Sequence, residues 1–280
     1  MKTANQKKEI VIGKKKSLKT VILELIQYKE LIYIFAWRDI KLKYRQTVLG
    51  FAWVILQPLL MMLIFTSIFS NKIGSIQEGF SYPVYVFSGL MIYNLFSNTV
   101  SSASNSLLFH SDIIKKNYFP RIILPTSSIL VSAFDFFISL LVLAVMLLMF
   151  QDEFVFFRFV GFSLSAFLLT VIPTLGIGVL LSALNVRYRD IKFVIPFFLM
   201  IMLFISPIIY PIDLNSTDLL QMILKINPLS ASIELMKSAI NPNYTPSNTL
   251  IAIGLGISLV IFCFALLIFN RIQKTLTDIL

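Results

Sequence analysis

One stretch of the sequence, Ile122–Phe150, reads IILPTSSILVSAFDFFISLLVLAVMLLMF and contains a single charged residue, Asp135. A helix of about 20 apolar residues is long enough to cross the hydrocarbon core of a bilayer, which is about 30 Å thick. Only helices satisfy every backbone group in lipid without closing a barrel, and this run is too long and too uniform for a barrel strand. The stretch is therefore predicted to be a transmembrane helix.

The composition of the whole chain also indicates a membrane protein. Of its 280 residues, 57% are hydrophobic and 14% are charged, whereas soluble domains contain about 25% charged residues. The first long apolar run begins near Leu49, too late for a cleaved signal peptide. We predict an all-α membrane protein with six transmembrane helices. Their approximate limits are Leu49–Ser70, Val84–Ser104, Ile122–Phe150, Val155–Ser182, Phe193–Tyr210 and Leu250–Asn270.

The basic residues predict the orientation of these spans. Most of the 24 lysine and arginine residues lie before Leu49, in the second and fourth connections, or after Asn270. By the positive-inside rule these segments and both termini are cytoplasmic, so we expect a multi-pass protein of the bacterial inner (plasma) membrane. The net charge of +10 then follows from topology and from attraction to anionic membrane lipids. We do not expect the chain to bind nucleic acid.

Four regions follow from this pattern. Residues 1–17 are predicted to be a flexible basic N-terminus, residues 18–48 a cytoplasmic interfacial region, residues 49–270 the six-span domain, and residues 271–280 a cytoplasmic tail. Within residues 18–48, apolar residues at helical spacing are mixed with basic ones, which indicates one or two amphipathic helices in the membrane interface. Such a region is either a simple anchor or a platform that contacts a soluble partner or lipid headgroups.

Two connections contain short helical patterns. The outer segment 212–248 contains stretches near Ser216–Ile226 and Pro228–Ile240, the second with Asn227 as its cap. Each stretch is too short to span but apolar enough to dip into the membrane. We predict a re-entrant outer hairpin, with a loop that skims the lipid surface as the alternative. On the cytoplasmic side, Leu107–Ile114 is expected to form a short helix, unless this loop is a plain connector.

No motif indicates a catalytic or metal site. The sequence contains no G-x-x-x-x-G-K-[ST], G-x-G-x-x-G or H-E-x-x-H motif, so we expect no ATP site in this chain. The only histidine, His110, cannot build a zinc site of the usual kind by itself. The single cysteine, Cys263, cannot form a disulfide within one chain. We therefore expect a chain that is not an enzyme.

Asp135 is the only charged residue deep inside a predicted span. Its insertion costs about 2.5–3.5 kcal/mol, which the surrounding apolar residues offset. We expect its side chain to face the bundle or a wet cavity, either in a pathway or as a packing contact.

Aromatic rings can bind the faces of sugars while they exclude bulk water. The candidates for a channel lining are therefore Asp135, Tyr82, Tyr85, Tyr93, Phe96, Phe197, Phe204 and Tyr210.

Glycine residues in two spans predict close helix packing. Gly176 and Gly178 give the fourth span a face of small residues, and Gly254 and Gly256 do the same for the sixth. Small residues allow the backbones of two membrane helices to approach closely. Ordinary packing is therefore the expected role of these faces.

Three stretches of the sequence resemble a known family. Trp37–Gly50 reads WRDIKLKYRQTVLG and leads into the first span. Asn185–Ile191, NVRYRDI, follows the fourth span, and Ser206–Pro211, SPIIYP, ends the fifth. From about Leu31 to the C-terminus, the chain is similar to the membrane (permease) subunit of type 2 ABC exporters of O-antigen and related lipid-linked polysaccharides.

The resemblance implies a homodimer that works with two copies of a separate ABC ATPase. ATP and Mg²⁺ would bind to that partner, with no cofactor in this chain, and the complex would carry a polysaccharide on undecaprenyl diphosphate out of the cytoplasm. The outer hairpin, 212–248, would form the gate helices. The residues implied to couple to the ATPase are Leu107, Leu108, Phe109, His110, Ile113 and Ile114. The residues implied to meet the diphosphate are Arg38, Lys41, Lys43 and Arg45, because charge-assisted bonds to phosphate are strong.

Two other functions are compatible with the sequence. One is a type 2 ABC permease for teichoic acid, another lipid or a small molecule. The other is a membrane-embedded glycosyl or phosphoryl transferase. A transferase would need clustered acids or histidines at the membrane face, whereas this sequence has only scattered ones.

Overall fold

The computed structural model describes residues 18–45, 50–70, 81–117, 119–150, 155–188 and 190–273, and all regular secondary structure in these ranges is helical. The all-α prediction is therefore confirmed for the described residues. The helices are α1 (Leu18–Gln27), α2 (Lys29–Arg45), α3 (Ala52–Phe69), α4 (Tyr82–Phe109), α5 (Ser111–Lys116), α6 (Ile123–Phe150), α7 (Phe156–Arg187), α8 (Ile191–Phe204), α9 (Leu219–Ile226), α10 (Pro228–Ile240) and α11 (Asn248–Ile272).

Four helices in the described ranges are long and apolar enough to cross a membrane, namely α3, α6, α7 and α11. They match four of the six predicted spans. Helix α4 has 28 residues, but its second half is rich in serine and asparagine. Helix α8 has only 14 residues and ends at Phe204, before the predicted limit at Tyr210. Pro207 explains this early end, because it cannot donate a helical hydrogen bond and it disfavours helix at Ser206. Helix length and composition thus do not confirm six spans.

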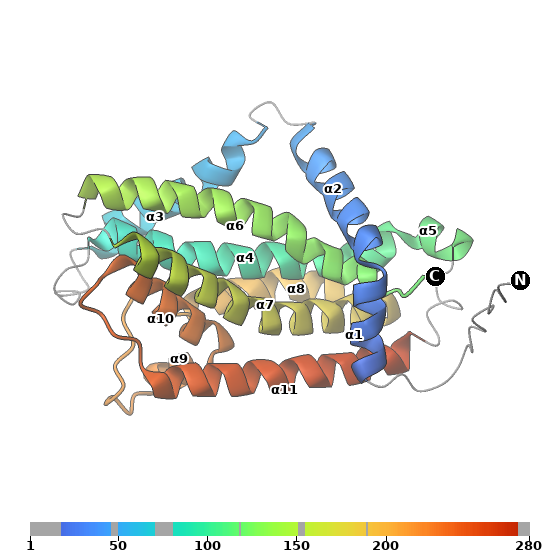
Figure 1. Ribbon diagram of the computed structural model, residues 1–280. Helices are drawn as coiled ribbons and strands as arrows, with labels where there is room; N and C mark the ends of the chain where they lie inside the picture. The colour runs from blue at the N-terminus through green and yellow to red at the C-terminus, as the bar shows by residue number, and fades with distance from the viewer. Residues whose placement is uncertain are drawn as a thin grey trace, which may run out of the picture.

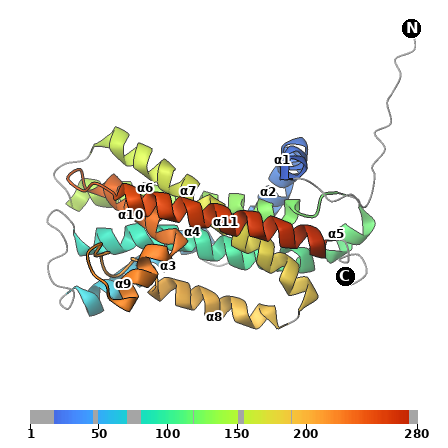
Figure 2. The same ribbon diagram turned by 90° about the horizontal axis from the view of Figure 1, so that it is seen from below.

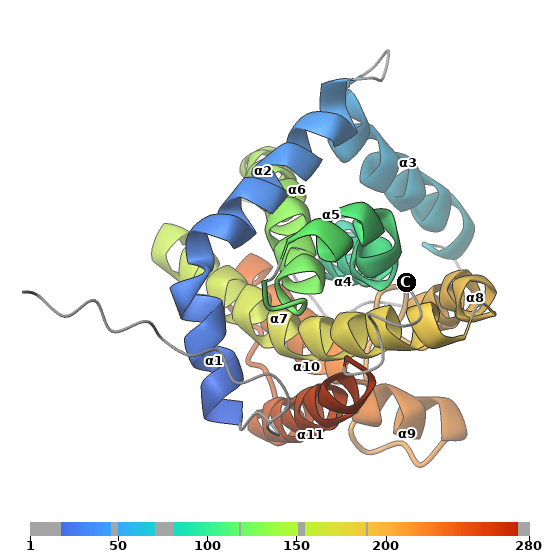
Figure 3. The same ribbon diagram turned by 90° about the vertical axis from the view of Figure 1, so that its right-hand side faces the viewer.

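Helix α4 lies at the centre of the bundle (Figure 3). It contacts α3, α6, α7, α8 and α10, whereas α11 packs against α7 and α10. The polar residues Ser88, Thr99, Ser104 and Ser106 of α4 are buried among these neighbours. Each hydroxyl donates to a carbonyl of its own helix. The low hydropathy of α4 is therefore compatible with its position, since these four buried hydroxyls are satisfied inside the protein.

The two ends of the bundle differ in character (Figure 1). At one end lie α1, α5 and the C-terminal ends of α7 and α11. At the other end lie α9, α10 and the N-terminal ends of α4 and α7. We call the first the basic end, since Lys115, Lys116, Arg187, Lys192 and Arg271 lie there, and the second the hairpin end. The structure thus brings the described basic residues of the second and fourth connections and Arg271 to one end, while the side of the membrane on which they lie stays a prediction.

Several predicted segments have different limits in the structure. The region 18–48 forms two helices that meet at Tyr28, and residues 46–48 lie outside the described ranges, as do residues 1–17 and 274–280. Leu107–Ile114 is not one helix, because the backbone leaves helical geometry at His110, with φ −107° and ψ 18°. Residues 107–109 therefore extend α4, and α5 begins at Ser111.

The outer segment forms α9 and α10 close to the predicted limits. Asn227 is the N-cap of α10, and its side chain accepts a hydrogen bond of 2.9 Å from the backbone nitrogen of Leu229. The amide of Asn227 also donates to the carbonyl of Ile205 at 2.8 Å. The cap prediction is thus confirmed, and the same side chain ties α10 to the end of α8. Whether the hairpin re-enters the membrane stays a prediction.

The glycine faces lie at close helix contacts, as predicted, at three of the four positions. A Cβ atom at Gly176 would meet the backbone of Phe262, one at Gly178 would lie 2.9 Å from the Cβ of Ala103, and one at Gly254 would lie 2.5 Å from the Cβ of Ala231. Gly256 is the exception, because a Cβ there meets nothing within 4 Å. These three glycines therefore allow close approach of α7 to α11 and α4, and of α11 to α10.

These contacts predict opposite effects for two neighbouring substitutions. Gly254→Ala would force α10 and α11 apart, because two carbon atoms cannot approach to 2.5 Å, and we expect a loss of about 1–3 kcal/mol of stability. Gly256→Ala is the matched control and is expected to leave the melting temperature unchanged or higher, since alanine favours helix. Thermal unfolding of both variants in one detergent, followed by circular dichroism, measures the difference. Equal melting temperatures would contradict the packing.

Candidate functional site

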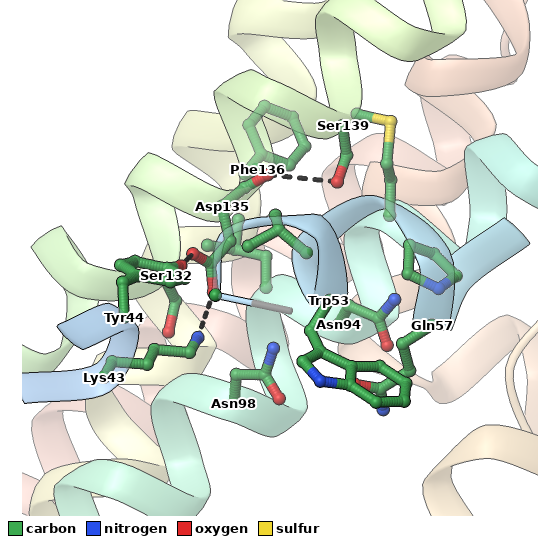
Figure 4. Close-up of a pocket in the computed structure, with 15 residues that line it drawn as sticks. Lys43, Tyr44, Trp53, Gln57, Asn94, Asn98, Ser132, Asp135, Phe136 and Ser139 are labelled. Atoms are coloured by element: carbon green, nitrogen blue, oxygen red, sulfur yellow. Dashed lines mark hydrogen bonds and ion pairs between the residues drawn. The ribbon is translucent and has the colours of Figure 1, made fainter. Parts of the chain in front are cut away.

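A cavity of about 230 Å³ lies between α2, α3, α4 and α6. We call it the α2–α3 cavity, because residues of these two helices form one of its sides (Figure 4). Apolar residues such as Met91, Leu95 and Phe136 form part of its wall. The polar and aromatic residues that line it are Lys43, Tyr44, Trp53, Gln57, Asn94, Asn98, Ser132, Asp135 and Ser139.

Asp135 lies at the wall of this cavity and is neutralised by α2. Its carboxylate forms an ion pair of 2.5 Å with the ammonium of Lys43 and accepts a hydrogen bond from the hydroxyl of Tyr44. Burial, followed by this hydrogen bond and the nearby negative charge, raises the pKa of the Tyr44 hydroxyl, so that it stays a donor. Asp135 lies roughly 18 Å along α6 from its first residue, at a rise of about 1.5 Å per residue. Helix α2 therefore reaches the middle of the bundle.

The four residues predicted to meet a diphosphate divide into two pairs. Arg38 forms an ion pair of 2.8 Å with Asp39, and Lys43 is bound to Asp135. Lys41 lies over the ring of Trp37, 5.3 Å from its centroid, and Arg45 is exposed. In the described ranges neither Lys41 nor Arg45 has a carboxylate partner. These two residues are the ones available to an anion, and their binding to phosphate stays a prediction.

The predicted coupling residues lie at the basic end, where α4 meets α5. Leu107 and Ile114 are buried and fix this turn to the bundle, whereas the Phe109 side chain is 81% exposed. Leu108 is also exposed, and Ile113 is half-buried. The turn thus presents an apolar surface to the outside of the described chain.

His110 connects this turn to α2. Its Nδ1 donates a hydrogen bond of 2.7 Å to the carbonyl of Ser106, and its Nε2 accepts from the guanidinium of Arg38. The edge of the ring also contacts Phe35 of α2. These contacts give His110 a positioning role between two helices. The described residues contain no group of three or more His, Cys, Asp or Glu side chains that could hold a metal ion.

The predicted channel-lining aromatic residues do not share one cavity within this protomer. Tyr85 and Phe96 of α4 are buried in the core. The hydroxyls of Tyr82 and Tyr93 donate to the carbonyls of Ile209 and Leu199 at 3.2 and 2.9 Å, so they tie α4 to α8 and to the segment after it. Helix α8 lies beside α4 (Figure 2) and carries Phe197 and Phe204, whereas Tyr210 lies in the segment after α8. Phe197 and Phe204 are exposed, and Tyr210 is half-buried. Their contact with a substrate stays a prediction.

Sequence reasoning missed a buried ion pair at the hairpin end. Glu234 and Lys237 of α10 lie 2.9 Å apart, and each side chain is only 2% exposed. The ammonium of Lys237 lies over the ring of Tyr85, 4.5 Å from its centroid, and the hydroxyl of Tyr244 donates to Glu234. Burial and the Glu234 carboxylate raise the pKa of Tyr244. The spacing of acid and base by three residues in an apolar helix was the available signal.

Another basic residue near the hairpin end, Arg158, also has a structural role. The guanidinium of Arg158, on α7, donates to the carbonyls of Ser238 and Tyr244 at 2.9 and 2.7 Å. Both carbonyls lie at or just after the C-terminal end of α10. Since free carbonyls at a helix end attract cations, Arg158 acts as a cap from a neighbouring helix. The two charges of α10 thus pair with each other and contact Tyr85 of α4 and Tyr244 after α10, whereas Arg158 of α7 holds backbone carbonyls.

A family model, described as ABC-2 type transporter, matches residues 30–241 of the sequence. This chain belongs to the ABC-2 type transporter family. As an ABC-2 chain with several apolar helices, it is a membrane permease, and the chains of this family that it resembles are permease subunits. The matched range includes α2, the α2–α3 cavity, the α4–α5 turn and both helices of the outer segment.

Curated relatives of this permease chain cover most of its length. An O-antigen export system permease protein, RfbA, of Klebsiella pneumoniae is 27% identical over 251 residues, 90% of this chain and 95% of the relative. The protein of the same name from Myxococcus xanthus is 29% identical over 210 residues, 75% of this chain and 79% of the relative. The polysialic acid transport protein KpsM of Escherichia coli is 24% identical over 241 residues, 79% of this chain and 89% of the relative.

The ion pair of α10 predicts a strong dependence of stability on charge balance. Glu234→Gln would leave the buried ammonium of Lys237 without its counter-charge, and we expect a loss of about 3–5 kcal/mol. The double variant Glu234→Gln with Lys237→Met removes both charges and is expected to be more stable than Glu234→Gln alone. Thermal unfolding of both proteins in one detergent measures this. If the double variant lost as much stability as the sum of the two single substitutions, Glu234 and Lys237 would not be energetically coupled.

The ion pair of α2 and α6 predicts coupling between distant positions. In a double-mutant cycle with Lys43→Met and Asp135→Asn, we expect a coupling energy of about 1–3 kcal/mol, because each variant removes the partner of the other. Lys41→Met is the control on the same helix, and its effect should stay within about 0.5 kcal/mol. Denaturant or thermal unfolding in nanodiscs provides the four stabilities. A coupling energy of zero would show that α2 is not held by this pair.

Proposed function

We propose that this chain is the membrane subunit of an ATP-driven exporter that moves a lipid-linked polysaccharide of the O-antigen type from the cytoplasm across the inner membrane. The observation that carries the proposal is the match along 90% of this chain and 95% of an O-antigen export permease. The absence of a P-loop motif from the whole sequence supports a separate ATPase subunit that holds ATP and Mg²⁺.

The proposed complex contains two copies of this chain and two copies of the ATPase. Many apolar side chains of α3 and α8 are exposed in the single protomer, among them Leu60, Leu63, Phe193 and Phe197. Contiguous apolar faces of this kind are covered either by lipid or by another protein. A second copy on part of this surface would enclose a passage that one protomer does not form.

The proposed topology has six spans, with α4 and α8 as the second and the fifth. Neighbouring helices bury Ser88, Thr99, Ser104 and Ser106 of α4, so these polar residues do not exclude a membrane position. Helix α8 is roughly 21 Å long, and residues 205–210 after it remain largely buried, so the chain can complete the crossing within the protein. The basic end would then face the cytoplasm, and the hairpin end would form a gate on the outside.

The proposed docking site for the ATPase is the α4–α5 turn. Phe109 and Leu108 are exposed there, while Leu107 and Ile114 fix the turn to the bundle. Movement of the turn would pass to α2 through the contact between His110 and Arg38. ATP binding to the partner would thus shift the balance between two conformations of the dimer through the apolar contact at the α4–α5 turn.

A second candidate is the export of an acidic capsular-type polysaccharide. It is favoured by the similarity to polysialic acid transport proteins, which covers 79% of this chain at 24% identity. Both candidates share the same architecture and differ in the polymer. Chemical analysis of the polymer retained by a deletion strain distinguishes them, and it also tests the export of teichoic acid.

Deletion of the gene tests the proposed direction of transport. We expect lipid-linked polymer to accumulate inside the cells and surface polymer to fall below a tenth of its normal amount, because no other path crosses the membrane. Immunoblots of whole cells and of lysates against the polymer measure both quantities. Restoration by the plasmid-borne gene is the control. Normal surface polymer in the deletion strain would contradict the proposal.

Substitution of Phe109 tests the docking site. Phe109→Ala is expected to weaken binding of the copurified ATPase about tenfold or more, since a central aromatic anchor commonly carries this much of an interface. Phe157→Ala is the matched control, because Phe157 is 87% exposed and lies at the hairpin end. Copurification and ATP hydrolysis by the purified complex provide the measurements. ATP hydrolysis by the purified chain alone would contradict the two-subunit assignment.

A further inference from the structure

The α2–α3 cavity contains polar side chains that have no partner in the protein. In the part of the chain that the structure describes, no hydrogen bond joins the side-chain amides of Asn94, Asn98 or Gln57 to another residue. Ser132 is only 3% exposed, yet its hydroxyl is likewise without a protein partner in that part. A buried serine on a helix usually donates to a carbonyl one turn before, as Ser139 does to Asp135 at 3.0 Å. These groups are therefore available to a ligand that enters the cavity.

The chemistry of these groups fits a polyol. An amide side chain offers two donors and an acceptor, and a hydroxyl offers one donor and two acceptors. A sugar hydroxyl is likewise both donor and acceptor, so it can bind to either kind of group. A lipid tail would leave Asn94 and Ser132 without hydrogen bonds, which costs free energy in an apolar environment. The polar wall therefore favours a hydroxylated ligand over an acyl chain.

The charges in the cavity favour a neutral ligand. Lys43 and Asp135 are paired at 2.5 Å, so they cancel within the cavity. A phosphate that took Lys43 away from Asp135 would leave this carboxylate with the Tyr44 hydroxyl but without a counter-charge inside the bundle, which is unfavourable. The basic residues without carboxylate partners in the described ranges, Lys41 and Arg45, lie on α2 and outside the cavity lining.

One aromatic ring completes the site. Trp53 of α3 lines the cavity beside Asn94 of α4 and across from the Asp135 cluster of α6 (Figure 4). The apolar face of a sugar ring can lie on an indole, while its hydroxyls bind the polar groups around it. The volume of about 230 Å³ is below the range of about 300–1,000 Å³ that drug-sized ligands occupy. The cavity therefore has room for one ring rather than for a chain of rings.

We propose that the α2–α3 cavity binds one neutral sugar ring of the exported polymer, with its hydroxyls on Asn94, Asn98 and Ser132 and its face against Trp53. The proposal deepens the proposed function and rests on it, because it assigns the sugar part of the substrate to a specific place. The ring would lie beside the contact of α2 with α6. Substrate binding and the position of α2 are thereby linked.

The two tryptophan residues of the chain, Trp37 and Trp53, allow a direct test. In the Trp37→Phe variant, Trp53 is the only tryptophan and reports from the cavity. The full-length protein is placed in nanodiscs of phosphatidylcholine, because maltoside and glucoside detergents carry sugar headgroups. Glucose, galactose, mannose and N-acetylglucosamine are the probes, and glycerol is the comparison. We expect a saturable change in emission with at least one sugar in the millimolar range.

Variants of the cavity test where the sugar binds. In the Trp37→Phe background, Asn94→Leu with Asn98→Leu is expected to weaken binding about tenfold or more, because two hydrogen bonds are lost. Ser132→Ala, which preserves the packing, is expected to weaken it about fivefold. Ser102→Leu is the control for the double variant. It puts a leucine at an exposed position of α4, the helix of Asn94 and Asn98, and should leave sugar binding unchanged. If the double variant fails to fold, Ser132→Ala alone decides.

Several results would overturn the proposal. One is the absence of any saturable change in the Trp37→Phe protein with all four sugars. Another is an equal change in the Trp53→Phe protein, in which Trp37 reports from the surface of α2, since this would place the effect outside the cavity. An equal response to glycerol would assign the cavity to small polyols or lipid headgroups. Unchanged binding in Ser132→Ala would exclude the assigned contact.

The binding test and the deletion test fail independently. Trapped polymer in the deletion strain together with no sugar binding would preserve the proposed function and remove this site. Sugar binding at Trp53 together with normal export in the deletion strain would preserve a sugar site and remove the export function. Loss of surface polymer in cells that carry Asn94→Leu with Asn98→Leu, at a normal level of the protein, would connect the two.

Discussion

The charged groups inside this apolar bundle are paired, and their contacts with side chains from other segments fix how the helices lie against one another. Lys43 and Asp135 are 92 positions apart in sequence, yet their ion pair fixes the end of α2 against the middle of α6. Glu234 and Lys237 are neighbours on α10, but α4 and the segment after α10 supply the groups around them. An unpaired charge in hydrocarbon is costly, so each pair restricts where its helices can lie.

The fold was predictable where it depends on local composition. The four apolar helices follow from runs such as Ile122–Phe150, the start of α10 follows from Asn227 and Pro228, and the close approach at Gly254 follows from a small residue in a span. The limits of α8 and of the α4–α5 turn were less predictable. They depend on one proline and on one non-helical backbone angle at His110, and the sequence pattern does not reveal which residue of a polar connection leaves the helix.

The candidate site was only partly predictable, because it is built from contacts between segments far apart in sequence. The importance of Asp135 could be inferred from its isolation in an apolar run. Its partners Lys43 and Tyr44 could not, since nothing in the sequence indicates that α2 leaves the surface and reaches α6. Likewise, Asn94 and Asn98 read as ordinary polar residues of α4 until the structure places them in the wall of the α2–α3 cavity. The burial of Lys237 could not be inferred either, because its surroundings come from α4 and from the segment after α10.

Helix α10 is held at its start by Asn227, along its length by the Gly254 contact with α11, and at its end by Arg158 of α7. These contacts hold α10 at its start, middle and end. We therefore expect a displacement of α10 to move α7 and α11 with it. A tilt of α10 at the hairpin end would in this way reach the basic end, where α7 and α11 terminate.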